Sequence, residues 1–452
     1  MRKTQKVRII LILLLFTFVI TLAPGCMNIL AEDLYALPQL SEGYLRLQSK
    51  INDVLGQGAE LSPPTGGVHR QAVQLRDLTG DGVDEVIAFF SIPSEGTLNV
   101  YIFVHEDGDY SVAEVIEVTG QSFESVRYVD MDGDGFEEIV IGWQMGPALR
   151  QMEIFSIRDF HAVSLTRTEY IEFVDFDLTG NGNNDIIVID PITPEQGTPV
   201  SMYMLMPDGE LVMSSARLSN GVDVISRILT GKLIDNTPAL FIESEGRFEA
   251  GNRLVTDVFV YRDGELVNIT VKGASGVSDE TVRARMSSSD INRDGIVKIP
   301  IPRELFAQSE TRYYAIDWYT FNRNGYSNLA LTTYHNNNDE WFLILPFDWR
   351  GRVSVRREDD VAGERTVVFS FIQDDDEILD FLKIYKITGD LREMRADLPN
   401  RQRLLSQGNA VYAFELLTPP NSFGLTFDED LIRDNFRLMY LDWLDVGNQQ
   451  HW

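Results

Sequence analysis

The sequence predicts an all-β fold, namely a β-propeller of about seven blades, each a four-stranded antiparallel sheet. Three observations lead to this prediction. Asp-rich loops recur about every fifty residues, each loop runs directly into an apolar segment, and hairpins with Asp-Gly or similar turns follow the loops. A unit of roughly fifty residues with four short strands suits one propeller blade. A pair of β-sandwiches or an open array of sheets is the alternative architecture.

The N-terminus has the pattern of a secretory signal. Basic residues precede an apolar run over residues 9–22, and small residues then lead to Cys26, the only cysteine in the chain. This segment resembles a bacterial lipoprotein signal, with residues 1–25 as the signal peptide and Cys26 as the lipidated residue, although Leu22 and Pro24 depart from the usual pattern. The alternative is an uncleaved anchor, since apolar residues continue to Leu30.

Either form of the N-terminus tethers the chain to the membrane, with the body on the extracytoplasmic face of the cell membrane. Residues 26–65 form the tether. Within it, Tyr44, Leu47, Ile51, Val54 and Leu55 recur at helical spacing and predict a short amphipathic helix. The propeller is expected over residues 66–446. A single cysteine excludes an intramolecular disulfide.

The charge of the chain restricts its partners. The 452 residues contain 39 Lys+Arg and 69 Asp+Glu, so the net charge is 39 − 69 = −30. Such a charge argues against binding to nucleic acid or to an anionic membrane surface. It fits an exported protein that binds cations, and a hydrophobic content of 44% is ample for a large core.

The most acidic loop, "DMDGDGFEE", predicts a metal site. Asp130, Asp132 and Asp134 alternate along a tight turn, Gly135 permits a sharp bend, and Glu138 returns four residues later. Converging carboxylates repel one another unless a cation lies between them. Calcium, which takes six to eight oxygen ligands in flexible geometry, suits this arrangement, and its role is expected to be structural. Solvated Asp-Gly turns without an ion are the alternative.

Two further loops repeat the spacing of the Asp130 loop with fewer carboxylates. Their oxygen-bearing residues are Asp77, Thr79, Asp81 and Glu85 in one loop, and Asp177, Thr179, Asn181 and Asp185 in the other. Because ligand charge tunes calcium sites, the affinity is expected to fall from the Asp130 loop to the Asp77 loop and then to the Asp177 loop. An EF-hand is excluded, since the flanking segments are strand-like and no glutamate stands at the twelfth position.

A fourth loop differs at one decisive position. It keeps Asp290, Asn292 and Asp294 but has Lys298 where the last carboxylate is expected, so it is predicted to hold no metal. A unit near Ile225 keeps the strand and lacks the ligands. Three later, less regular units begin near residues 313, 366 and 410, and "FIQDDDEILDF" from Phe371 is either a solvated turn or a further cation loop.

The three acidic loops, each followed by "DEVIAFF", "EEIVIGW" or "NDIIVID", resemble FG-GAP/VCBS repeats, as found in the propeller of integrin α chains. With its leader, the chain looks like the VCBS-repeat lipoproteins of Gram-positive bacteria. The resemblance is specific over about residues 70–190 and weak beyond residue 220. It implies calcium in the loops between the first two strands of some blades, and it does not imply a ligand.

Catalytic motifs are absent from the sequence, which contains no HExxH, GxSxG or glycine-rich phosphate loop. Its histidines are scattered, at positions His69, His105, His161, His335 and His451. Aromatic residues gather in "RYYAIDWYTFNRNGY" and "TTYHNNNDEWF", where they either pack in the core or line a face that stacks sugars or clasps a peptide. We expect a calcium-stabilised binding module for an envelope protein or glycan. The alternatives are a propeller-based glycan hydrolase or lyase, and a purely structural envelope-assembly factor.

Overall fold

The computed structural model describes residues 42–439 apart from 107, 159, 249–250, 274, 307–310 and 374–376. The predicted signal peptide, the lipidated Cys26, most of the tether before the helix, His451 and the end of the predicted propeller therefore lie outside the described residues. The same holds for the aspartates at 374–376, on which the further cation loop depends. Within the described part of the chain, no helix is long and apolar enough to cross a membrane.

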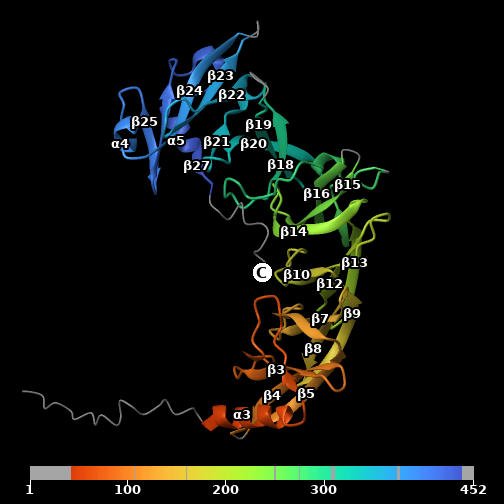
Figure 1. Cartoon of the computed structure of the whole chain (residues 1–452). Helices are drawn as coiled ribbons and strands as arrows, with labels where there is room; N and C mark the ends of the chain where they lie inside the picture. Colours follow the sequence, from red (N-terminus) through yellow and green to blue (C-terminus); the bar gives the residue numbers. More distant parts are fainter. Residues whose placement is uncertain are drawn as a thin grey trace, which may run out of the picture. The chain divides into compact units, whose positions relative to one another are not determined.

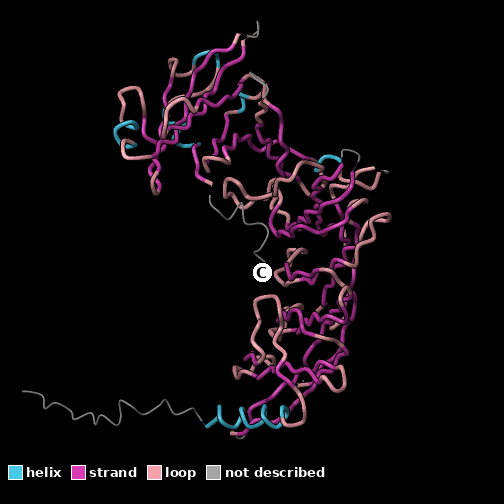
Figure 2. The backbone as a smooth tube through the Cα atoms, in the orientation of Figure 1, coloured by secondary structure: helices cyan, strands magenta, loops and turns pink. Residues whose placement is uncertain are grey.

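Strands make up most of the described chain (Figures 1 and 2). The strands of the first three sheets are β1 (Glu60–Leu61), β2 (Val73–Arg76), β3 (Glu85–Ile92), β4 (Thr97–Glu106), β5 (Asp109–Thr119), β6 (Ser122–Val129), β7 (Glu138–Gly146), β8 (Leu149–Arg158), β9 (His161–Glu169), β10 (Glu172–Phe176), β11 (Asp185–Ile189), β12 (Pro199–Leu205) and β13 (Leu211–Arg217). Those of the last three are β14 (Val222–Lys232), β15 (Pro238–Phe248), β16 (Gly251–Arg262), β17 (Glu265–Asn268), β18 (Ile299–Glu304), β19 (Tyr314–Phe321), β20 (Ser327–Asn336), β21 (Trp341–Leu345), β22 (Val353–Glu358), β23 (Glu364–Ile372), β24 (Ile378–Thr388), β25 (Gln402–Gln407), β26 (Ala410–Leu416) and β27 (Phe436–Leu438). The helices are α3 (Glu42–Leu55), α4 (Arg392–Ala396) and α5 (Glu429–Asn435), with short 3₁₀ turns η1 (Asp279–Thr281), η2 (Phe347–Trp349) and η3 (Ser422–Gly424).

The described strands form six antiparallel sheets of four or five strands. In the second, third and fourth sheets the four strands pair in chain order, as in β6-β7-β8-β9. This up-and-down order is that of a propeller blade. The all-β prediction, the propeller-type sheets and the short N-terminal helix are confirmed.

The last predicted unit does not form a sheet of its own within the described residues. Strand β26, which contains its "AVYAFEL" segment, pairs with both β24 and β25 and so lies inside the sixth sheet. Strand β27 pairs with β21 at the edge of the fifth sheet. Six sheets therefore account for the seven units that the sequence pattern predicted.

Consecutive sheets share buried hydrophobic clusters. The first and second sheets meet where Phe89 of β3 contacts Phe123 of β6 edge-on, with ring centroids 5.1 Å apart. The fifth and sixth sheets share a larger cluster that includes Trp341, Trp349 and Phe369. The central strands, such as β11, are buried over their whole length, which explains why they read as continuous apolar runs rather than alternating ones.

The described residues fall into two compact units. One contains α3 and residues 105–111, where Lys50 Nζ lies 3.6 Å from Asp109 Oδ2 and Arg46 donates a hydrogen bond to the Gly108 carbonyl. The other contains the remaining described residues, including all of the Asp-rich loops. The candidate sites below lie entirely within this second unit.

Candidate metal centre

The four Asp-rich loops share one closing geometry. In each loop, the residue before the first aspartate pairs with the residue eight positions after that aspartate. The pairs are Arg76 with Glu85, Val129 with Glu138, Phe176 with Asp185, and Ser289 with Lys298. The first three loops connect β2 to β3, β6 to β7 and β10 to β11, so each joins two neighbouring strands at the start of its sheet. The fourth loop directly precedes β18.

Hydrogen bonds to the first aspartate hold each loop in its turn. Asp130 accepts from the Gly133 and Gly135 amides, at 2.7 and 3.0 Å. Both glycines have positive φ, 77° and 90°, which residues with a side chain rarely adopt. In the other loops the amides four and five residues after the first aspartate donate to Asp77, Asp177 and Asp290, so the donor five residues on is common to all four loops. Hydrogen bonds from backbone amides to the first aspartate therefore hold the turn, and the later side chains determine what the loop binds.

The Asp130 loop brings three carboxylates together. Oxygens of Asp130, Asp132 and Glu138 all lie within 4.8 Å of one another, and no other group of three acidic, histidine or cysteine side chains in the described residues does so. Two oxygens that bind one calcium at about 2.3–2.6 Å are at most about 5 Å apart. The three residues therefore fit a calcium ion, and their side chains also suit another hard cation.

Burial makes these carboxylates unfavourable as free anions. It raises the pKa of Glu138 to about 7, and the charge of Asp132 adds to the effect, while hydrogen bonds from the Met131 amide and Ser156 hydroxyl oppose it. Burial also raises the pKa of Asp132. A buried carboxylate near another carboxylate is stabilised in its charged form when a cation binds to both. The Asp130 loop is thus an anionic site whose own residues supply no positive charge to balance it.

An arginine that the sequence pattern did not reveal stands beside this cluster. Arg158, at the end of β8, places a terminal nitrogen 2.7 Å from Asp134 Oδ2 and its other terminal nitrogen 3.4 Å from Asp132 Oδ2. The second nitrogen is 3.9 Å from Glu138 Oε1. Asp134, expected as the fourth ligand, is therefore turned toward this guanidinium. Arg158 follows the motif by more than one strand, so only the β7–β8 hairpin brings it near.

The Asp77 loop holds an oxygen without a partner. Glu85 accepts from the Leu78 amide at 2.8 Å, and Asp81 accepts from the Val83 amide at 2.8 Å. The hydroxyl of Thr79 is buried and makes no hydrogen bond with any described residue. A buried polar atom without a partner is unfavourable, and a bound cation would supply one. Burial raises the pKa of Glu85, as it does that of Glu138.

In the Asp177 loop the side-chain oxygens are already used within the loop. Asp185 accepts from the amides of Leu178 and Thr179, at 3.0 and 3.1 Å. The Thr179 hydroxyl donates to Asp177, and Asn181 accepts from a nearby amide. Burial nevertheless raises the pKa of Asp185 to about 6. With two carboxylates and these internal partners, this loop is the least suited of the three to a cation.

The Asp290 loop carries its own cation. The ammonium of Lys298 lies 2.6 Å from Asp294 Oδ1 and 3.6 Å from Asp290 Oδ1, and its side chain is 2% exposed. It also donates to the Ile296 carbonyl at 2.9 Å. The positive charge thus occupies the side of the loop that the last carboxylate occupies in the other three. A metal ion in this loop would have to displace the Lys298 ammonium.

Comparisons with known proteins add no family. No family model matches the chain, and no curated protein matches it. Among solved structures, a protein from Lactobacillus plantarum aligns at 12% identity over 54% of this chain and 67% of its own, with a TM-score of 0.26. The rhamnogalacturonan lyase YesW aligns at 11% identity over 71% of this chain and 76% of its own, and the exotype rhamnogalacturonan lyase YesX at 10% over 72% and 74%, both with TM-scores of 0.26. Similarities this weak carry no argument about function.

Proposed function

We propose that the Asp130 loop binds a structural calcium ion and that the chain is a calcium-stabilised, membrane-tethered β-propeller, which acts as a binding module in the cell envelope. The observation that carries the calcium site is the convergence of Asp130, Asp132 and Glu138 oxygens within 4.8 Å. Asp134 joins them when Arg158 moves aside. The ion supplies positive charge to buried carboxylates and links the start of β7 to the turn before it.

Calcium is preferred over other metals because of the donor set. All of the side-chain donors are oxygens, which favours hard cations and disfavours zinc or copper. The loop from Asp130 to Glu138 contains no histidine or cysteine. A cluster of carboxylates on a turn suits calcium, which accepts flexible geometry, better than magnesium, which requires near-octahedral geometry.

The loop pattern supports assignment of the repeats to the FG-GAP/VCBS type. Three loops lie between two neighbouring strands at the start of their sheets, where the resemblance implies calcium. Their internal hydrogen bonds support the expected order of affinity. The Asp130 loop has converging carboxylates, the Asp77 loop has three carboxylates with an unpartnered Thr79 hydroxyl, and the Asp177 loop has its oxygens engaged.

The proposed location of the protein is inferred from its N-terminal signal pattern. A signal pattern that ends at Cys26 supports a lipid anchor on the extracytoplasmic face of the membrane, and the net charge of −30 supports a partner other than nucleic acid. We infer an envelope protein or glycan as the partner. Cell fractionation tests the tether: wild-type protein in the membrane fraction and Cys26→Ser protein in the soluble fraction support lipidation, whereas membrane retention of Cys26→Ser supports the uncleaved anchor.

Calorimetric calcium titration of the full chain in mild detergent tests the metal site. Asp132→Asn is expected to remove the tightest binding event, because it deletes a ligand charge without changing the size of the side chain. Asp290→Asn is the matched control, since Asp290 holds the same turn in a loop neutralised by Lys298. Loss of binding in both variants, or in neither, would contradict the assignment of calcium to the Asp130 loop.

A further inference from the structure

A cavity of about 700 Å³ opens between the fourth and fifth sheets. This volume lies within the range of roughly 300–1,000 Å³ that is typical of small-ligand sites. Its walls come from β16, the segment after η1, β18 and the ends of β19 and β20. The cavity lies in a different part of the fold from the Asp130 loop, between sheets that hold none of the three acidic loops.

The charge of the cavity is opposite to that of the chain. Four arginines line it, Arg253, Arg283, Arg285 and Arg312, and no aspartate or glutamate is among the described residues of its lining. In a chain with 69 acidic and 39 basic residues, a lining with four arginines and no acidic side chain is a local excess of positive groups, although Glu243, Glu245 and Glu304 pair with three of these arginines from outside the lining. Such a site attracts anions and repels the protein's own acidic surface.

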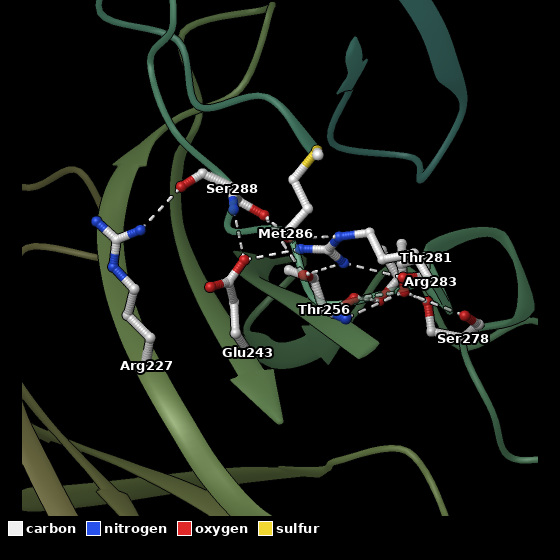
Figure 3. A network of polar contacts seen from close by, with 9 residues as sticks. Arg227, Glu243, Thr256, Ser278, Thr281, Arg283, Met286 and Ser288 are labelled. Atoms are coloured by element: carbon white, nitrogen blue, oxygen red, sulfur yellow. Dashed lines mark hydrogen bonds and ion pairs between the residues drawn. The ribbon is translucent and has the colours of Figure 1, made fainter. Parts of the chain in front are cut away.

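Arg283 forms the rigid floor of the cavity rather than a free binding group. It is 1% exposed and forms an ion pair with the equally buried Glu243 at 2.8 Å. Figure 3 shows how its guanidinium is surrounded. It donates to Met286 O, Thr256 Oγ1, Thr281 O, Glu243 Oε1 and Ser288 Oγ. These bonds use all five N–H donors of an arginine.

This network fixes the segment that carries the next arginine. The Ser288 amide also donates to Glu243, at 2.6 Å, and Arg227 donates to the Ser288 carbonyl at 3.0 Å (Figure 3). The chain between Thr281 and Ser288 is therefore held at both ends. Arg285, in the middle of this segment, is presented from a rigid support, which lowers the entropy that binding would otherwise cost.

The remaining arginines are available to a ligand. Arg253 is half-buried on β16 and makes no ion pair with any described residue. Arg285 and Arg312 are exposed, and among the described residues their ion pairs are with Glu245 and Glu304. Ion pairs of this kind are weak, so an anionic ligand can replace them.

Aromatic rings lie beside these arginines. Tyr313 and Tyr314 contribute to the lining, and the Tyr314 side chain is 45% exposed. Tyr334 forms a buried part of the wall. A tyrosine ring offers an apolar face together with a hydroxyl, which suits a ligand that has both apolar ring faces and hydroxyl groups. Arginine guanidiniums bind carboxylates through two parallel hydrogen bonds.

From this combination we infer that the cavity binds an acidic oligosaccharide, in which sugar rings carry carboxylates. The carboxylates contact Arg253 and Arg285, and the sugar rings pack against Tyr313 and Tyr314. A simple anion such as phosphate would use the arginines but leave the tyrosines without a role, and a neutral sugar would do the reverse. This inference specifies the class of glycan that the proposed binding module recognises. It does not depend on calcium at the Asp130 loop.

Calorimetry on the full chain in mild detergent tests the inference. The probes are trisaccharides of glucuronate, mannuronate and galacturonate, with maltotriose and inorganic phosphate as comparisons. At least one uronate trisaccharide is expected to bind tenfold or more tightly than both comparisons. Arg253→Gln and Arg285→Gln are each expected to weaken that binding tenfold or more, since a hydrogen bond to a charged group is worth about 1.5–3 kcal/mol, or about tenfold or more in affinity.

Two controls separate this result from other causes. Arg247→Gln removes an arginine from the same sheet that is 86% exposed and outside the cavity, and it is expected to leave binding unchanged. Asp132→Asn is expected to remove the tightest calcium-binding event while trisaccharide binding persists, so the two proposals can fail separately. Absence of binding by all three uronates, equal binding of phosphate or maltotriose, or unchanged binding in Arg253→Gln and Arg285→Gln would overturn the inference.

Discussion

The Asp130 and Asp290 loops have the same turn but different sources of positive charge. In both loops the first aspartate accepts from two amides of the turn, and the residue before it pairs with the residue eight positions later. The closing residue is Glu138 in one loop and Lys298 in the other. The hydrogen bonds from turn amides to the first aspartate are thus common to both loops, and the charge of the closing residue is what differs between them.

The two closing residues also differ in how their charge is balanced. Lys298 is buried against two aspartates, so its loop is neutralised from within. Glu138 is equally buried but faces Asp130 and Asp132, and the nearby Arg158 nitrogen is 3.9 Å away. A buried charge requires a close partner of opposite sign. Of the two loops, the Asp130 loop is therefore the one in which a cation from solution would stabilise the buried carboxylates.

The largest expected effect comes from replacing the internal cation. Lys298→Glu converts the Asp290 loop into the pattern of the Asp130 loop and places three carboxylates together. With a chelator present, we expect a loss of about 4 kcal/mol in the free energy of unfolding, because removing one partner of a buried ion pair leaves uncompensated charge. Excess calcium should restore most of this loss. Denaturant unfolding with and without calcium measures both.

Lys272→Glu is the control for that substitution. Lys272 is about half exposed and pairs with Glu280 at 2.9 Å, so its replacement should cost less than about 1 kcal/mol and should not depend on calcium. If Lys298→Glu were no more sensitive to chelator than Lys272→Glu, the closing residue would not determine the cation requirement.

The reciprocal substitution removes the calcium effect from the Asp130 loop. Glu138→Gln should abolish a calcium-dependent stabilisation of about 3 kcal/mol, the value expected when free calcium exceeds the dissociation constant by 100- to 1,000-fold. Chemical unfolding in calcium and in chelator measures the difference. Glu153→Gln, a buried carboxylate paired with Arg167 at 2.7 Å, should lower stability equally in both conditions. A calcium effect that survives Glu138→Gln would place the ion elsewhere.

The two loops should respond to pH in opposite directions when calcium is chelated. Burial raises the pKa of Glu138 from 4.5 to about 7, so the folded state binds more protons between these values. Its contribution to stability therefore falls by about 2 kcal/mol as the pH rises from 5 to 8. For Asp294, burial acts to raise the pKa, but hydrogen bonds from Lys298 and other donors outweigh it and lower the pKa from 3.8 to about 2.

The stabilisation from Asp294 is accordingly present above about pH 3.8 and is lost as the pH falls toward 2. Unfolding measured across this whole range, in wild type and in Glu138→Gln, separates the two contributions. The decline between pH 5 and 8 should be about 2 kcal/mol smaller in Glu138→Gln and in wild type with calcium, while the part that comes from Asp185, whose pKa burial also raises, should remain. A decline in stability of undiminished size in Glu138→Gln and in wild type with calcium would mean that a group other than Glu138 causes it.

The smallest expected effect concerns the arginine beside the site. Arg158→Gln removes a competing positive charge and frees Asp134, so calcium affinity should rise about tenfold, equivalent to about 1.4 kcal/mol. Calcium titration measures this change, and Arg167→Gln on the neighbouring strand β9 is the control. Weaker binding in Arg158→Gln would show instead that the arginine orders the ligands.

The local parts of this structure could be predicted from the sequence. Asp130, Asp132 and Glu138 lie on one short turn, in which nearby amides donate hydrogen bonds to Asp130. Their convergence therefore follows from residues that are neighbours in the sequence. Lys298 could be recognised for the same reason, since it takes a position defined by the motif. The helix over Glu42–Leu55 and the continuous strands such as β11 likewise follow from residue periodicity.

Features that depend on distant parts of the chain could not be predicted. Strand β26 joins the sixth sheet across an inserted helix, and nothing in its own residues distinguishes this from the start of a new sheet. Arg158 reaches the metal loop only through a hairpin. The arginine-lined cavity combines segments from two sheets, and the aromatic run around Tyr313 did not reveal that Arg253 lies near it.

A thermal melt of the wild-type full chain, with excess calcium and with chelator, tests the calcium-stabilised fold most directly. We expect calcium to raise the melting temperature by roughly 3–4 °C, given a stabilisation of about 3 kcal/mol in a body of this size. An equal excess of magnesium should give a much smaller shift. Identical melting temperatures in calcium and chelator would contradict a structural ion and would leave the Asp-rich loops as turns held by hydrogen bonds to their first aspartate.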